Sequence, residues 1–354
     1  MKAAVATSAV AVAGSALAEQ SVGSTLAPGA VNAMLSWQVG RVKITRIVEM
    51  DLPVPAEFMP GATPAELRKL PWLYPHFVSA DDSTLNMSVH ALLVEAPGLT
   101  PEVLAENRGW MRDAGALDAN DVLILCFQSY IVQTPHHTIL IDSCIGNDKP
   151  RPLRPKWNMK TDDTYLRALN AAGFGVGDID FVMCTHLHVD HVGWNTMLEN
   201  GKWVPTFPRA SYLIGRREYE WMLTVDDEEQ QAMLGDSIKP IIDAGLIELV
   251  EMNHVISPEI RLTPSAGHTP GHISVLIESE GQRAVITGDV CHHPSQMAHL
   301  DWQFGDYDKP AGMLTRKRLF TEWADQPILV IGTHFAAPTA GRIIRDGAAF
   351  RFEV

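Results

Sequence analysis

The sequence predicts a layered α/β protein whose functional residues lie along one edge of its sheets. Short apolar segments of strand length alternate with helical segments through most of the 354 residues. Polar side chains repeatedly follow these apolar segments, at the carboxyl ends of the predicted strands. Alternating strands and helices are typical of α/β folds, in which ligands bind beyond the carboxyl ends of strands.

The first half of the chain is expected to contain two hairpins and three helices. Residues 37–50 alternate apolar and polar side chains, as a half-buried hairpin does. Thr63-Pro64 predicts a helix start, because threonine caps helices and proline suits the first turn. In chain order we predict a hairpin at 37–50, a short helix after Thr63-Pro64, a strand at 87–96, a helix at 100–115, hairpin strands at 123–134 and 137–143, and a helix at 161–172.

The second half repeats this alternation, and several of its apolar segments run directly into histidine or aspartate. We predict strands at 178–184, 210–215, 246–252, 260–264, 274–279, 283–290 and 327–334, two short helices within 216–244, and a helix near 311–324.

The amino terminus has the layout of a secretory signal. Lys2 precedes an Ala/Val-rich run, and Ala16-Leu17-Ala18 supplies the small-x-small pattern of a cleavage site. We therefore expect a signal peptide at 1–18, a flexible Gly/Ser/Ala-rich lead-in at 19–36, and a periplasmic or secreted protein. The alternative is a frayed Ala-rich helix on a cytoplasmic protein.

Composition narrows the choice of partners. The chain is 46% hydrophobic, which is enough for a full core, and it carries a formal net charge of −14. An acidic surface repels phosphate backbones and anionic lipid, so we expect neither a nucleic acid nor a membrane partner. Four cysteines without CxxC spacing predict ordinary buried thiols rather than a disulfide scaffold. A small-molecule substrate is the expected partner.

One short segment carries the strongest chemical signal. Residues 185–191 contain the pattern HxHxDH, formed by His186, His188, Asp190 and His191. Imidazole nitrogens bind Zn²⁺ well and a carboxylate compensates charge, so these side chains at a strand end predict a metal site. The alternative is a polar turn without a metal, in which the histidines form hydrogen bonds with backbone groups.

Three later strand ends add residues of the same kind. His268 lies in the glycine-flanked loop GHTPGH, Asp289 follows Gly288, and His334 follows Gly332-Thr333. Each residue comes after a buried apolar run, and glycine lets the backbone approach closely. Each is weak evidence alone, but their combination favours one metal centre.

In this order the motifs resemble those of metallo-β-lactamase-fold hydrolases, across residues 37–354. The resemblance implies an αβ/βα sandwich of two mixed sheets flanked by helices, with an N-terminal insertion around 52–120. It also implies two divalent metal ions, one held by His186, His188 and His268, the other by Asp190, His191 and His334, with Asp289 bridging them. Asp142, in Asp142-Ser143-Cys144, matches an aspartate that supports the metal loop in that family.

Details of the motifs narrow the resemblance to one branch. An aspartate at 289 is unlike the β-lactamases that use cysteine there, and is similar to N-acyl homoserine lactonases and methyl parathion hydrolase. Lactonases carry tyrosine three residues after that aspartate, whereas His292 here is more similar to methyl parathion hydrolase. The run CTHLHVDHVGWN also resembles chlorothalonil hydrolytic dehalogenase.

The resemblance implies a hydrolase that directs a metal-bridging hydroxide at a small hydrophobic substrate. Two metals lower the pKa of a shared water towards ~7. Asp190 is the candidate proton shuttle, and His292 either contacts substrate or packs in its loop. Trp157 and Trp194 are candidate aromatic walls of the substrate pocket. His272 and His293 are expected to be structural.

Several choices stay open at the level of sequence. Lactones, aryl esters and phosphotriesters are unranked substrates; a hydrolytic dehalogenase of chlorinated aromatics is the main alternative, and a β-lactamase or a flavin-linked redox role is less favoured. Zinc is the expected metal, although His/Asp sites also accept Mn, Co or Fe. The Pro-rich segment 52–86 predicts either a pocket lid or the arm of a homodimer.

Overall fold

The computed structural model describes residues 34–50, 52–55, 59, 61–74, 77–78, 84–87, 127–335 and 338–354, with backbone alone for 52–55 and 84–87. The predicted signal peptide, most of the lead-in, nearly all of the strand at 87–96 and the whole helix at 100–115 lie outside the described residues. Only the first part of the predicted insertion around 52–120 therefore lies among the described residues.

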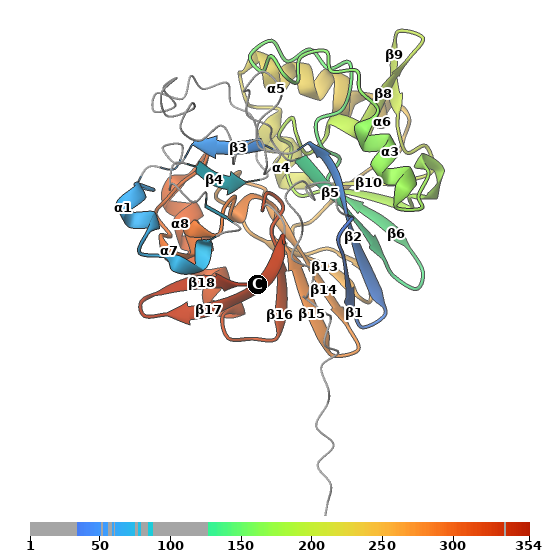
Figure 1. Cartoon of the computed structure of the whole chain (residues 1–354). Helices are drawn as coiled ribbons and strands as arrows, with labels where there is room; N and C mark the ends of the chain where they lie inside the picture. Colours follow the sequence, from blue (N-terminus) through green and yellow to red (C-terminus); the bar gives the residue numbers. More distant parts are fainter. Residues whose placement is uncertain are drawn as a thin grey trace, which may run out of the picture.

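Two seven-stranded sheets form the centre of the structure (Figure 1). The first has the order β1 (Ser36–Val39), β2 (Val42–Met50), β5 (Phe127–Gln133), β6 (Thr138–Ile141), β7 (Phe181–Cys184), β10 (Ser211–Gly215) and β11 (Ile247–Val250). The second has the order β12 (Val255–Ser257), β13 (Ile260–Pro264), β14 (Ile273–Ser279), β15 (Gln282–Ile286), β16 (Ile328–Ile331), β17 (Ala340–Asp346) and β18 (Ala349–Glu353). Both sheets contain parallel and antiparallel pairs, so both are mixed.

The two sheets face each other across a shared apolar layer. Ile139 and Met183 of the first sheet belong to the same buried cluster as Val275 and Ile286 of the second. Neighbouring residues on the same strands, such as Leu140, point the other way and join a second cluster. This alternation follows from the two-residue period of a strand, and it gives each sheet an inner and an outer apolar face.

Helices cover the outer faces. Leu169 packs with the outward side chains of the first sheet, and Phe320 with those of the second. In the described part of the chain the α-helices are α1 (Pro64–Leu67), α3 (Thr164–Ala171), α4 (Arg216–Met222), α5 (Glu228–Met233), α6 (Lys239–Asp243), α7 (Ser295–Ala298) and α8 (Lys309–Trp323). The layers are thus helix, sheet, sheet and helix, which confirms the predicted αβ/βα sandwich. No helix among the described residues has the length and apolar character that a bilayer span requires.

Most described elements lie where the sequence predicts them, with informative exceptions. The predicted strand at 283–290 ends at Ile286, because Gly288 at φ 56° opens a 3-10 turn over Gly288–Val290 that carries Asp289. The predicted pair of helices within 216–244 is α4, α5 and α6, with a π-helical turn at Leu234–Ile238. The hairpin of β17 and β18 and the short hairpin of β8 (Thr196–Glu199) and β9 (Lys202–Pro205) were not predicted.

Gly193 allows the HxHxDH loop to pack against the loop that follows β6. Its backbone N–H donates to the Cys144 carbonyl at 2.7 Å, and a Cβ built on it would lie 1.8 Å from the Ile145 carbonyl oxygen. Only glycine fits so close an approach of two backbones.

Gly193→Ala is therefore expected to lower the free energy of unfolding by about 3 kcal/mol, at the upper end of overpacking effects. Urea unfolding measures this loss. Gly177→Ala is the matched control, because a Cβ there meets nothing within 4 Å, and it should change stability by less than about 1 kcal/mol. Equal stability of the two variants would contradict the close packing at Gly193.

Candidate metal centre

The predicted metal-binding residues all follow strands that end at the same edge of the sandwich. β7 runs parallel to β6, so the loop with residues 185–191 starts beside Asp142. In the second sheet, β15 and β16 are parallel with Ile286 opposite Ile331, which brings Asp289 and His334 to one edge. The Ile273 N–H donates to the Thr185 carbonyl at 3.0 Å and joins the edges of the two sheets.

The first group of ligand atoms comes from His186, His188, His268 and Asp289, all within 4.8 Å of one another. The His188 Nδ1 lies 2.9 Å from His186 Nε2 and 3.0 Å from His268 Nε2. The Asp289 Oδ2 lies 3.5 Å from His186 Nε2 and 3.2 Å from His268 Nε2. A tetrahedral metal with bonds of 2.0–2.1 Å places its ligand atoms about 3.3 Å apart, close to these separations.

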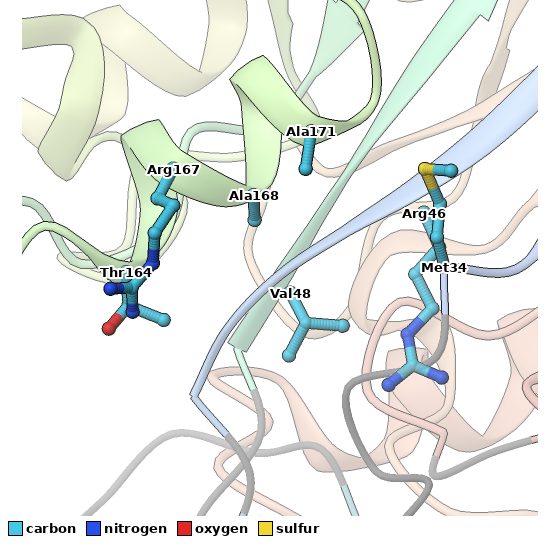
Figure 2. A pocket seen from close by; sticks show the side chains of 7 residues that line it. All are labelled: Met34, Arg46, Val48, Thr164, Arg167, Ala168 and Ala171. Atoms are coloured by element: carbon cyan, nitrogen blue, oxygen red, sulfur yellow. The ribbon is translucent and has the colours of Figure 1, made fainter.

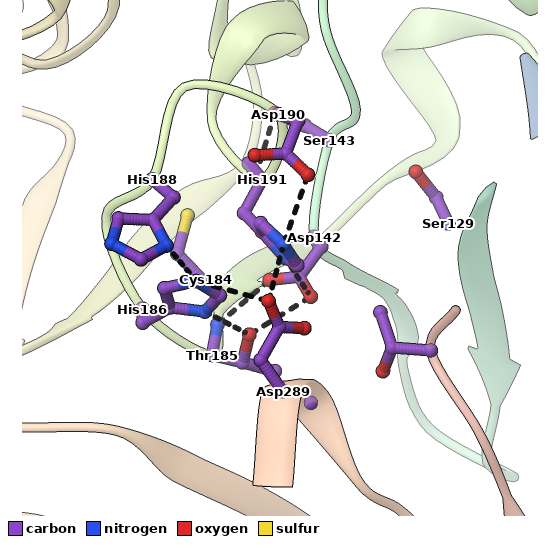
Figure 3. A network of polar contacts seen from close by, with 12 residues as sticks. Ser129, Asp142, Ser143, Cys184, Thr185, His186, His188, Asp190, His191 and Asp289 are labelled. Carbon is purple, nitrogen blue, oxygen red and sulfur yellow. Dashed lines mark hydrogen bonds and ion pairs between the residues drawn. The ribbon is translucent and has the colours of Figure 1, made fainter. Parts of the chain in front are cut away.

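The second group is formed by Asp190, His191 and His334. The His191 Nε2 lies 3.3 Å from both Asp190 Oδ2 and His334 Nε2. Asp289 reaches this group as well, with Oδ1 2.8 Å from His334 Nε2 and Oδ2 3.4 Å from His191 Nε2. One carboxylate therefore contacts both groups, and Figure 3 shows it facing His186, His191 and Asp190.

The donor set fits two divalent cations. Imidazole nitrogens and carboxylate oxygens suit Zn, Mn, Co and Fe alike, so the chemistry does not select one metal. Burial, and then the positive charge of His191, lower the pKa of His186 well below its ordinary value, so this imidazole is neutral and able to coordinate. The structure thus brings all seven predicted ligands together; that they bind metal remains our proposal.

His191 behaves differently from His186 in the metal-free protein. Burial opposes its protonation, but the carboxylates of Asp289, Asp190 and Asp142 outweigh burial and raise the pKa of His191 well above its ordinary value. Because a metal binds the neutral imidazole, metal binding here must displace a proton.

Carboxylates behind the ligands orient two of the imidazoles. Asp142 Oδ2 lies 2.9 Å from His191 Nδ1, while Asp142 accepts from the Thr185 N–H at 2.7 Å and the Thr185 hydroxyl at 2.9 Å. Asp142 has φ 57°, a left-handed conformation in which Asp and Asn are enriched among non-glycine residues. A carboxylate on the far nitrogen of a ligating histidine sets its tautomer, so Asp142 lies where the family resemblance implies support for the metal loop.

A second such carboxylate was missed by sequence reasoning. Asp306 Oδ1 lies 3.5 Å from His268 Nδ1, and Arg316 donates to Asp306 Oδ2 at 2.8 Å. Burial opposes protonation of His268, but the carboxylates of Asp289 and Asp306 beside its two ring nitrogens raise its pKa to about 9. Asp306 follows Gly305 in the segment before α8, not a strand, so no strand-end pattern marks it.

His292 lies within the cluster rather than beside it. Its Nε2 is 3.1 Å from Asp289 Oδ2, and its ring is stacked on that of His334 with the centroids 5.3 Å apart. The Phe304 ring also lies against the His292 ring, with the two centroids 4.8 Å apart. His292 also forms a group of possible ligand atoms with Asp289 and His334, and its role toward substrate stays a prediction.

The two predicted pocket tryptophans lie in the hydrophobic core, so that expectation does not match the structure. Trp157 is fully buried and packs edge-on against Phe127 with ring centroids 4.9 Å apart. Trp194 is stacked on Tyr165, and its indole N–H donates to Glu49 Oε1 at 2.9 Å. Both side chains turn inward, Trp157 onto Phe127 and Trp194 onto Tyr165 and Glu49.

His272 and His293 each contact a backbone group of another segment, as expected of structural residues. The Asp289 N–H donates to His272 Nε2 at 2.7 Å, and burial lowers the pKa of His272 to about 3, so this imidazole remains an acceptor. His293 Nδ1 lies 2.7 Å from the Ser295 hydroxyl, and its other nitrogen contacts the Phe77 carbonyl.

Replacing His293 by glutamine is expected to reduce the acid sensitivity of the metal-free protein. Burial lowers the pKa of His293 to about 3, against the hydrogen bond to Phe77 that favours its protonated form. The unfolded chain takes up this proton near pH 6.5, so the folded state loses stability as the pH falls from 6.5 towards 3. His293→Gln should lose about 1.4 kcal/mol less per pH unit in this window. Urea unfolding at several pH values tests this. The exposed His136→Gln is the control, and equal slopes in both variants would contradict the prediction.

A separate hollow of about 290 Å³ lies between β2 and α3 (Figure 2). Its lining residues are Met34, Arg46, Val48, Thr164, Arg167, Ala168 and Ala171. None of them belongs to the two ligand groups, so this hollow is not the site of the metal chemistry.

Comparisons with known proteins agree with this geometry. Residues 128–316 match the family model described as "Metallo-beta-lactamase superfamily". An N-acyl homoserine lactonase from Bacillus sp. is 24% identical over 229 residues, which cover 61% of this chain and 84% of that relative. A second, from Bacillus thuringiensis, is 24% identical over 216 residues, covering 58% and 79%.

Solved structures show the same fold. The hydrolase AbOPH of the β-lactamase superfamily superposes with a TM-score of 0.63 at 19% identity, covering 90% of this chain and 96% of that one. AidC, a dizinc quorum-quenching lactonase, has a TM-score of 0.61 at 19% identity with the same coverage. The family match and the shared sandwich confirm the resemblance found in the motifs. The chain belongs to the metallo-β-lactamase superfamily and is a hydrolase of that family.

Proposed function

We propose that the protein is a dinuclear metal-dependent hydrolase that opens a small lactone or cleaves a similar carboxylic ester. One observation carries the dinuclear part: the Asp289 carboxylate has one oxygen 2.8 Å from His334 and the other 3.2 Å from His268, and so spans both ligand groups. The choice of a lactone is supported by two relatives named N-acyl homoserine lactonase. The match to this chain covers 84% and 79% of their length.

We propose a role for each residue, and its position in the structure supports that role. Two bound divalent ions supply Lewis acidity, which activates water at neutral pH and polarises a carbonyl oxygen. The buried Asp190 carboxylate, whose Oδ2 faces His191 Nε2 at 3.3 Å, is placed to carry a proton towards the leaving alcohol. His292, with Nε2 near Asp289, is placed to orient the substrate from the side of Phe304.

Zinc is the metal we propose, as in the dizinc lactonase AidC. We also propose that the protein is exported, because residues 1–18 have the layout of a secretory signal. We further propose that its partner is a small-molecule substrate rather than a nucleic acid or a membrane, because the net charge is acidic. A homodimer stays a prediction.

A metal analysis paired with a substrate panel tests the proposal. The purified protein should hold two divalent ions per chain. It should hydrolyse a γ-lactone or a p-nitrophenyl ester with a kcat/KM at least about tenfold above that for a paraoxon-type phosphotriester or nitrocefin, a margin of about 1.4 kcal/mol in transition-state binding. Chloride release from chlorothalonil without lactone hydrolysis would instead favour the dehalogenase. Two bound ions without hydrolysis of any ester would contradict the proposed function.

A further inference from the structure

Glu218 is a buried carboxylate that the sequence analysis did not single out. It lies in the first turn of α4, directly after β10, and its side chain is 1% exposed. β10 is the parallel neighbour of β7, with Ile214 opposite Cys184, so the start of α4 lies beside the start of the HxHxDH loop. A buried carboxylate is costly unless several donors satisfy it.

Three donors meet this carboxylate, and each belongs to a segment that carries a predicted ligand. Oε1 accepts from the Leu187 N–H at 3.2 Å, and Leu187 stands between the ligands His186 and His188. Oε2 accepts from the Thr269 hydroxyl at 2.8 Å and from the Gly271 N–H at 2.9 Å, just after the ligand His268.

The contact between α4 and the His268 loop is too close for a larger side chain at its centre. A Cβ on Gly271 would lie 2.3 Å from the Glu218 backbone nitrogen. The two ligand-bearing segments are 80 residues apart in sequence, and Glu218 joins them although it is not among the ligand groups itself.

We infer that Glu218 is a positioning residue, which clamps the two backbone segments carrying His186, His188 and His268 so that the first ligand group is preorganised for its metal. The inference deepens the proposed function and rests on its dinuclear site. A carboxylate suits the task because both of its oxygens accept hydrogen bonds, whereas an amide turns an N–H₂ group towards at least one of the three donors. Partners outside the ligand shell commonly change metal affinity 10–100-fold when they are removed.

The test is a titration of metal-free full-length protein with Cd²⁺, followed by ¹¹³Cd NMR, in which the two sites are resolved. In Glu218→Gln the first group should bind Cd²⁺ at least about tenfold more weakly, while the site of Asp190, His191 and His334 keeps its affinity. Glu220→Gln is the matched control: this glutamate is exposed on the same helix, and both affinities should equal those of the wild type. A residue with a general structural role would weaken both sites together with the thermal stability of the metal-free protein.

Thr269 gives a second, milder test that does not depend on how well Glu218→Gln folds. Thr269→Val removes one bond to Glu218 and should weaken the first site severalfold, whereas Thr269→Ser keeps the hydroxyl and should restore its affinity. When Glu218→Gln and Thr269→Val are combined, the loss of Cd²⁺ affinity at the first site should be smaller than the product of the two single losses, because both changes remove the same contact.

The outcomes separate this inference from the proposed function. Unchanged affinity of the first site in Glu218→Gln and Thr269→Val, or equal loss at both sites, overturns the clamp even if the wild type hydrolyses lactones. A selective loss at the first site supports the clamp even if the wild type, loaded with two metals, hydrolyses none of the substrate panel.

Discussion

Asp289→Ala is expected to abolish hydrolysis and to lower the metal content below two ions per chain. Asp289 contacts both ligand groups, through Oδ1 to His334 and Oδ2 to His268, so its removal takes a ligand from each. Two-metal activation is worth several kcal/mol of transition-state stabilisation, which corresponds to a loss of roughly 10³-fold or more in kcat/KM. Metal analysis after gel filtration and lactone hydrolysis measure the two effects.

Asp346→Ala is the control for this prediction. Asp346 is the exposed last residue of β17, in the hairpin with β18, and it belongs to neither ligand group. The variant should keep two ions and full activity. Full activity of Asp289→Ala with two ions per chain would remove the bridging assignment.

Asp142→Asn is expected to weaken metal binding at the second group by about 10–100-fold. Asparagine also tolerates the left-handed backbone at φ 57°, so the substitution changes the carboxylate without straining the chain. The loss has a clear cause, because Asp142 holds His191 Nδ1 at 2.9 Å and thereby presents Nε2 to the metal. An amide nitrogen facing this imidazole favours the other tautomer.

The same substitution should also destabilise the metal-free protein. There the raised pKa of His191 keeps it protonated, and replacing Asp142 leaves this buried cation without one of its carboxylates. Removing one partner of a buried pair costs about 3–5 kcal/mol, which urea unfolding at pH 7 measures. Asp346→Asn, at the exposed end of β17, is the control. Metal affinity and stability both equal to the wild type would contradict the support role of Asp142.

The ligand groups were predictable because their signals are local. His186, His188 and Asp190 stand within one short segment, and His334 follows a buried strand directly. Residue type and position after an apolar run are enough to indicate such a site. The β17–β18 hairpin has no comparable signal, since short strands with mixed exposure are poorly marked by periodicity.

The two tryptophans show where the local argument fails. Trp157 and Trp194 were assigned to a pocket wall because they are aromatic and close in sequence to the site. The direction of a side chain on a loop depends on what lies beneath it, and here Phe127 and Tyr165 provide an apolar surface on the inner side. The gain from burying the aromatic surface of Trp157 and Trp194 therefore explains why both side chains point into the core.

What the sequence determined by itself is the chemistry of the centre and the class of fold: ligand types are a property of side chains, and strand and helix periods are a property of neighbouring residues. The family resemblance implied one supporting group, Asp142, but only the tertiary structure decided the others. Asp306 reaches His268 from the segment before α8, and Glu218 reaches Leu187 and Thr269 from α4. These contacts join segments tens of residues apart, and they exist because the two sheets stack with their strand ends at one edge, an arrangement that local patterning does not encode.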